Sequence, residues 1–90
     1  MEIEPVQPVT IIMKSMTGQS FAQLIKLSDL TMEVSADEYY PELTPIQFQS
    51  NYFRGSGTVE GIEFNRNCFR YTLKLEHIQF KPGLVINTRL

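Results

Sequence analysis

The sequence predicts an all-β fold, a small six-stranded antiparallel barrel, and three observations support this prediction. Short runs rich in β-branched and aromatic residues alternate between apolar and polar side chains, which is the pattern of half-buried strands. Glycine, proline and asparagine separate these runs, and helical periodicity is almost absent. A chain of 90 residues has room for one modest core, and closing a small sheet into a barrel removes the edges that an open sheet must protect.

The chain is expected to begin with an arm and a hairpin. Residues 1–8 contain two prolines and two glutamates, which disfavour a helix or a central strand, so we assign them to a short irregular N-terminal arm. Residues 9–90 are assigned to a single barrel domain. Its first strand is expected at residues 9–13 and, after turn residues at 17–19, its second strand at 21–27.

The second strand also has a helical interpretation. Leu24, Ile25 and Leu27 give residues 21–30 a partial helical pattern. Residues 31–35 alternate with period two, which favours strands on both sides of the Ser28-Asp29 break. In the strand interpretation, one face carries Phe21, Gln23, Ile25 and Leu27, and the other carries Ala22, Leu24 and Lys26.

A polar loop is expected to cross from the third strand to the fourth. Residues 36–45 contain two prolines, and the loop can hold one helical turn at most. Its Tyr39 and Tyr40 are expected to close one end of the core. The fourth strand is expected at residues 46–49, and the glycines of residues 53–57 predict either a tight connection or a bulge.

The last two strands are expected to form a long hairpin. They comprise residues 59–64 and 69–80, joined by a turn at 65–67 in which asparagine adopts positive φ. The apolar parity of the last strand changes between Leu75 and Ile78, which predicts a bulge at a barrel corner. Pro82-Gly83 then ends the strand, and residues 84–90 form a short tail that can pair or pack.

Composition argues against several classes of partner. The net charge is −2 and the eight Lys and Arg residues are scattered, so DNA and RNA are not expected partners. No apolar run approaches the ~18 residues that span a bilayer. Cys68 is the only cysteine, which rules out an intrachain disulfide, and no apolar leader opens the chain. These features predict a cytoplasmic protein in a reducing compartment.

The sequence contains no pattern typical of an enzyme, a metal site or a bound cofactor. His77 is the only histidine and has no cysteine beside it in the sequence. Ser28, Asp29 and His77 are the residue types of a catalytic triad, but adjacent Ser and Asp side chains point to opposite faces of an extended chain. Residues 53–57 lack the following helix and the Lys-Ser/Thr pair of a phosphate loop.

The order of the expected strands and loops along the chain is similar to that of a known domain family. A hairpin, a second strand ending in a Leu-Ser step, a short strand and a proline-bearing loop lead to Pro-Ile-Gln-Phe, Gly-Ser-Gly-Thr-Val and finally Ile78-Gln79-Phe80. From residue 9 to residue 80, this order resembles a PilZ domain, a six-stranded bacterial barrel known for binding cyclic di-GMP. The resemblance implies a signalling domain.

The chain departs from the ligand motifs of that family. PilZ domains that bind the dinucleotide carry Arg-x-x-x-Arg before the first strand and Asp/Asn-x-Ser-x-x-Gly after the second. Here residues 2–8 contain no arginine and two glutamates. In the second motif Ser28 matches, whereas Lys26 replaces the acid or amide and Thr31 replaces the glycine. The resemblance therefore implies a degenerate member, and non-binding members are adaptors in motility, pilus and surface-attachment systems.

Two functions remain open at the level of sequence. The first is a non-enzymatic adaptor that docks a protein partner or a second copy through Tyr39 and Tyr40 or through residues 84–90. The second is a cyclic di-GMP receptor with a non-standard site. Its ligand-binding residues would be Lys26, Ser28, Thr31, Arg54 and Arg70.

Overall fold

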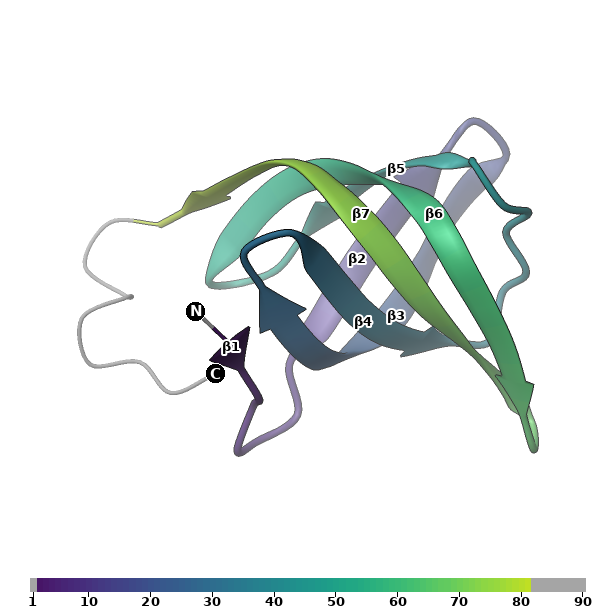
Figure 1. The fold of residues 1–90 in the computed structure, drawn as a ribbon, viewed down its shortest axis with the longest axis horizontal. Coiled ribbons are helices and arrows are strands. Elements are labelled where there is room, and N and C mark those ends of the chain that lie inside the picture. Colours follow the sequence, from purple (N-terminus) through teal and green to yellow (C-terminus); the bar gives the residue numbers. More distant parts are fainter. Residues whose placement is uncertain (1, 82–90) are drawn as a thin grey trace.

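The chain forms a closed antiparallel barrel of six strands with one additional strand (Figure 1). The computed structural model describes residues 2–81, and no helix occurs among them. The strands are β1 (Glu2–Ile3), β2 (Thr10–Ser15), β3 (Gly18–Ser28), β4 (Thr31–Ala36), β5 (Pro45–Gln49), β6 (Phe53–Asn65) and β7 (Cys68–Phe80). The expected all-β barrel is confirmed, and the helical interpretation of residues 21–30 is wrong.

Two meanders make up the barrel. The first contains β2, β3 and β4, and the second contains β5, β6 and β7, with neighbouring strands paired within each. Two seams join the meanders, because β2 pairs with β5 and β4 pairs with β7. The seams close the sheet, so each of these six strands has a neighbouring strand on both sides.

The N-terminal arm is more regular than expected. Glu2 and Ile3 form β1, which pairs with Ser28 and Leu27 at the end of β3. β3 is longer than β2, and its last residues therefore have an unpaired edge that β1 can extend. The prolines of the arm lie between β1 and β2, outside both strands.

The connection between β5 and β6 also differs from the expectation. Residues 53–57 lie within β6, and the turn lies before them. Ser50 forms this turn, because its hydroxyl accepts hydrogen bonds from the backbone N–H groups of Tyr52 and Phe53 at 3.0 and 3.2 Å. Serine next to asparagine is a turn signal in its own right. The expected tight connection at residues 53–57 is therefore wrong; the register does shift between Ser56 and Gly57, but the extra residue lies opposite, in β7.

Bulges bend the long strands where they wrap around the barrel. Ser56 pairs with His77 and Gly57 pairs with Leu75, so Glu76 is the extra residue of β7. This shift confirms the predicted change of parity between Leu75 and Ile78. A second shift in β6 lies between Val59 and Gly61, and a third interrupts β3.

The core fills the barrel interior with residues from β2 to β7. Its largest fully buried side chains are Tyr71, Phe53, Ile11, Met13, Met32, Ile46, Leu73, Val34 and Val59. Each large apolar side chain stabilises the fold by about 1.5–3 kcal/mol relative to an exposed position. Phe53 packs edge-to-face against Phe48 and Phe80, which links the start of β6 to β5 and β7.

Two further expectations concern the C-terminal half. In the β6–β7 turn the positive φ of 58° belongs to Arg66 and not to an asparagine, although the turn itself lies where it was expected. The predicted break at residues 82–83 and the predicted tail at 84–90 lie outside the described residues. Residues 2–81 contain no helix long and apolar enough to cross a membrane.

Candidate functional site

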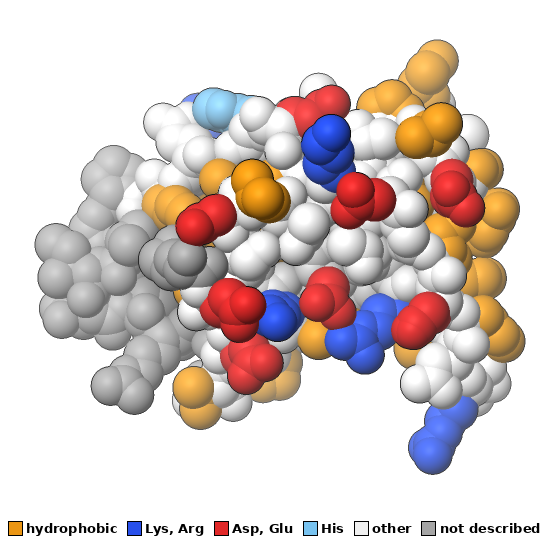
Figure 2. All heavy atoms as spheres, viewed as in Figure 1, with side chains coloured by type: hydrophobic (Ala, Val, Ile, Leu, Met, Phe, Trp, Pro, Cys, Tyr) orange, Lys and Arg blue, Asp and Glu red, His pale blue; other side chains and the backbone are white. Residues whose placement is uncertain are grey.

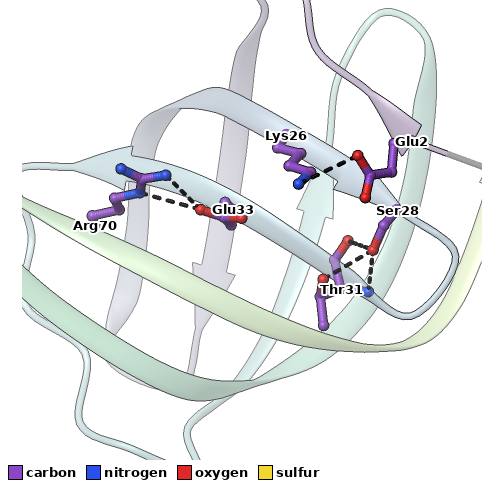
Figure 3. A network of polar contacts seen from close by, with 6 residues as sticks. All are labelled: Glu2, Lys26, Ser28, Thr31, Glu33 and Arg70. Atoms are coloured by element: carbon purple, nitrogen blue, oxygen red, sulfur yellow. Dashed lines mark hydrogen bonds and ion pairs between the residues drawn. The ribbon is translucent and has the colours of Figure 1, made fainter.

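Ser28 and Thr31 close the turn between β3 and β4 (Figure 3). The Ser28 hydroxyl accepts a hydrogen bond from the Thr31 backbone N–H at 3.2 Å and donates to the Thr31 carbonyl at 3.2 Å. The two hydroxyls also lie 2.9 Å apart. The polar atoms expected to contact a ligand therefore already stabilise the turn in which they lie.

Lys26 has an acidic partner in the N-terminal arm. Its Nζ lies 3.4 Å from Oε1 of Glu2, which β1 brings to the end of β3 (Figure 3). This ion pair is solvent-exposed at Glu2, so its contribution to stability is small. Glu2 also offsets the positive charge that an anionic ligand would contact.

Arg70 also has an acidic partner. Its Nη2 and Nε donate hydrogen bonds to Oε1 of Glu33 at 2.6 and 3.2 Å. The hydrogen bonds and the charge of Glu33 raise the pKa of the Arg70 guanidinium above its ordinary value. Because β4 and β7 are paired, the two residues lie on one surface although they are far apart in sequence.

Arg54 lies on another part of the surface. It points outward from β6, between Gln49 of β5 and Gln79 of β7. It borders a groove of about 340 Å³, here called the outer groove. The structure thus groups Lys26, Ser28 and Thr31 around one hairpin, places Arg70 with Glu33, and separates Arg54 from them all.

The two tyrosines of the β4–β5 loop have different environments. Tyr40 is only 4% exposed, and its hydroxyl is hydrogen bonded to the Ser20 hydroxyl. Its backbone N–H donates to the Tyr71 hydroxyl at 2.7 Å. Tyr40 therefore closes the core as expected, but it is not available as an exposed interface residue, which corrects half of the predicted interaction surface. Tyr39 is 58% exposed.

Tyr39 belongs to an exposed aromatic cluster that we call the aromatic end, defined by Tyr39, Phe64 and Phe69. The Phe69 ring centre lies 5.5 Å from that of Tyr39 and 4.9 Å from that of Phe64. Phe64 is 65% exposed and Phe69 is half-buried. On the right of Figure 1 the β4–β5 loop lies between the β2–β3 turn at the top and the β6–β7 turn at the bottom, and hydrophobic side chains line that edge in Figure 2.

No family model, curated protein or solved structure matches this chain. The all-β barrel therefore rests on the structure itself, and the PilZ resemblance stays a prediction. Among the described residues, no three His, Cys, Asp or Glu side chains are grouped as they would be around a metal ion.

Neither the aromatic end nor the outer groove is predicted from the sequence. Phe64 and Phe69 flank the β6–β7 turn as a cross-strand pair, which is a signal that the hairpin pattern contained. The sequence indicates the outer groove only weakly. Its one sign is that alternation places Gln47 and Gln49 on the outer face of one strand, and His77 and Gln79 on the outer face of another. Only strand register shows that these strands come together.

Proposed function

We propose that this chain is a non-enzymatic adaptor of PilZ type in the bacterial cytoplasm, and that it acts through protein contacts made by the aromatic end. The observation that carries the proposal is the exposure of Tyr39 and Phe64 around the ring of Phe69. Aromatic residues are enriched at protein interfaces because a rigid ring buries a large area at a low cost in conformational entropy.

Further apolar side chains extend this surface. Met16 in the β2–β3 turn and Leu43 in the β4–β5 loop are both exposed. A small cavity lined by residues 17–19 and 38–40 shows that the β2–β3 turn and the β4–β5 loop adjoin. A partner that binds the β4–β5 loop would therefore also reach the turns on either side of it, and no catalytic group is needed for that role.

The alternative function, a cyclic di-GMP receptor with a non-standard site, has less support. A ligand with two phosphates would have to displace Glu2 from Lys26 and Glu33 from Arg70. It would also have to compete with the hydrogen bonds between Ser28 and Thr31. Arg54 lies too far away to assist them, because it pairs with Gln49 and with Gln79, near the opposite end of β7 from Arg70.

The test of the adaptor function compares two ends of the barrel. In the test variant, Tyr39→Ser and Phe64→Ser are combined. The control is Leu30→Ser, since Leu30 is 75% exposed in the β3–β4 turn, away from the aromatic end. Surface substitutions of this kind change stability by about 0.5 kcal/mol or less, so both variants should fold.

We expect the wild type and Leu30→Ser to bind the same protein in pull-downs from the native host, and the double variant to lose it. Purified partner and chain should then reproduce this difference in calorimetry. Sedimentation velocity distinguishes a second copy of the chain as the partner. The proposal fails if the double variant binds everything that the wild type binds, or if the wild type binds no protein and remains monomeric.

Calorimetry with cyclic di-GMP tests the alternative separately. We expect no saturable heat at micromolar ligand. A saturating isotherm that Lys26→Ala and Ser28→Ala abolish would favour the receptor function over the adaptor function. A failure to bind a protein partner would not by itself change the outcome of this calorimetric test.

A further inference from the structure

The outer groove has a floor of small residues and a rim of long polar ones. Gly55 and Ser56 of β6 form the floor. A Cβ on Gly55 would lie 2.0 Å from the carbonyl oxygen of His77, so β6 and β7 approach each other closely here. Strands β2, β5, β6 and β7 supply the rim, which contains Ile12 and the long polar side chains of Lys14, Gln47, Gln49, Arg54, His77 and Gln79.

Strand register arranges these side chains in two rows across four strands. In one row Lys14 pairs with Gln47, Gln47 with Ser56, and Ser56 with His77. In the other row Ile12 pairs with Gln49, Gln49 with Arg54, and Arg54 with Gln79. Cα atoms of paired residues lie about 5 Å apart, and rows two residues apart are separated by roughly 7 Å. The long side chains can therefore converge above Ser56.

The side chains that line the groove give it a positive charge, which no acid among residues 2–81 pairs with. Lys14 and Arg54 line it, and no Asp or Glu does. Neither cation forms an ion pair with any residue between 2 and 81, in contrast to Lys26 and Arg70. The nearest acid along β7, Glu76, accepts a hydrogen bond from Thr58 at 3.2 Å. The chain as a whole has a net charge of −2, so two cations without an acidic residue beside them form a local positive region that favours an anion.

The other groups in the groove can bind neutral polar parts of a ligand. The carboxamides of Gln47, Gln49 and Gln79 form no side-chain hydrogen bond within the described part of the chain. Each can donate and accept, and the His77 ring adds a further donor. A volume of about 340 Å³ is at the lower end of the range for small-molecule sites.

We propose that the outer groove binds a small phosphomonoester, such as a sugar phosphate or a mononucleotide. Arg54 and Lys14 bind the phosphate, and the three glutamines bind hydroxyl or amide groups of the organic part. Arg54 can engage two phosphate oxygens at once through its planar guanidinium. A nucleic acid strand fits less well, because two cations supply only a small part of the backbone contacts on which such binding depends.

This site is independent of the proposed adaptor function. It lies on the side of the barrel formed by β2, β5, β6 and β7, whereas the aromatic end involves the turns that flank these strands. A partner that binds the aromatic end can be lost without any change in ligand binding at the groove, and the reverse also holds.

The test is a heteronuclear NMR titration of the full chain at constant ionic strength. The probes are glucose 6-phosphate, adenosine monophosphate, inorganic phosphate and the two uncharged parents, glucose and adenosine. We expect at least one of the two phosphomonoesters to give saturable shifts in the backbone amides around Gln47, Ser56 and His77. The phosphomonoester that binds more tightly shows whether the groove prefers a sugar or a nucleoside as the organic part. The uncharged parents should give no saturable shifts.

Variants locate the phosphate. Arg54→Gln and Lys14→Gln should each weaken binding at least about tenfold, because each removes a charge-assisted hydrogen bond. Lys74→Gln is the matched control, since Lys74 is an exposed cation of β7 outside the groove, and it should leave the affinity unchanged.

Four results would overturn the proposal. They are the absence of saturable shifts at millimolar phosphomonoester, equal binding of the uncharged parents, binding of inorganic phosphate as tightly as either ester, and equal weakening by Lys74→Gln. A single-stranded oligonucleotide serves as a sixth probe, and its tighter binding than that of either ester at the same amides would be a fifth contrary result, which would assign the groove to nucleic acid.

Discussion

Tyr71 shows how one side chain holds the β4–β5 loop on the barrel. Its ring lies fully buried in the core, and its hydroxyl donates a hydrogen bond to the Glu38 carbonyl at 2.7 Å. The same hydroxyl accepts a hydrogen bond from the Tyr40 backbone N–H. The loop therefore has its position fixed by a residue of β7, and with it the ring of Tyr39.

Replacing Tyr71 with phenylalanine should lower the free energy of unfolding by about 1–3 kcal/mol, because two backbone groups of the loop lose their partner. Urea denaturation followed by circular dichroism measures the change. Tyr39→Phe is the control, since its hydroxyl forms no hydrogen bond with residues 2–81, and it should cost almost nothing. Equal effects of the two substitutions would contradict this role of Tyr71.

Tyr71 also predicts a pH dependence. Burial raises its pKa above the ordinary value of 10.0. The unfolded chain therefore releases this proton at a lower pH than the folded chain does. The contribution to stability is complete below pH 10 and is lost as the pH rises through the folded pKa. Urea denaturation across the alkaline range should show a smaller decline for Tyr71→Phe than for the wild type.

Residue-scale roles were only partly visible in the sequence. Tyr39 and Tyr40 are adjacent and chemically identical, and nothing in their sequence context shows that only Tyr40 reaches the core. Likewise, Lys26 and Arg70 looked available for a ligand because their partners come from other strands. Glu2 and Glu33 meet them only through strand pairing.

At the scale of elements, β6 depends on glycine for close approach to β7. A Cβ on Gly55 would clash with backbone atoms of His77 and Ile78, whereas a Cβ on Gly61 would meet only the Thr72 side chain at 3.6 Å. The two glycines lie in the same strand, so they form a matched pair for testing backbone proximity.

Gly55→Ala should destabilise the chain by about 1–3 kcal/mol or more, because the β6 and β7 backbones must separate. Gly61→Ala should be neutral or stabilise by up to about 1 kcal/mol, since alanine restricts the unfolded chain. Thermal and urea denaturation measure both. A Gly55→Ala variant as stable as Gly61→Ala would show that the strands accommodate the methyl group.

Period-two patterns predicted all six barrel strands, but they placed one side chain on the wrong face of β3, where a bulge changes the parity. In β3, Ala22, Leu24 and Leu27 are buried although Leu27 has the opposite parity, because the register shifts between Leu24 and Lys26. In β7 the change of parity could be recognised from the apolar residues. In β3 it could not, because Phe21 and Ile25 place apolar side chains on the outer face as well.

At the scale of the whole molecule, the two meanders share one core. Each presents a single apolar face, and the seams from β2 to β5 and from β4 to β7 bring these faces together. Barrel closure could be expected from the size of the chain, but the order of strands around the barrel could not. For that reason the aromatic end and the outer groove could be recognised only in the three-dimensional structure.

Fragments 1–42 and 43–90 should be largely unfolded alone and should form a β-rich complex when mixed, because neither meander can bury its apolar face by itself. Near-ultraviolet circular dichroism and size-exclusion chromatography measure this. The break follows Glu42, an exposed residue of the β4–β5 loop. A fragment that folds cooperatively by itself would contradict the interdependence of the meanders.

The order of the meanders along the chain also shapes how the protein is made. Residues 10–36 leave the ribosome first, with Ile11, Met13 and Val34 on a face that only β5, β6 and β7 can cover. Translation of residues 45–80 takes roughly 2–7 s at bacterial to eukaryotic speeds. Until residues 45–80 are also free to pair, the apolar side chains of residues 10–36 lack the strands that bury them in the finished barrel.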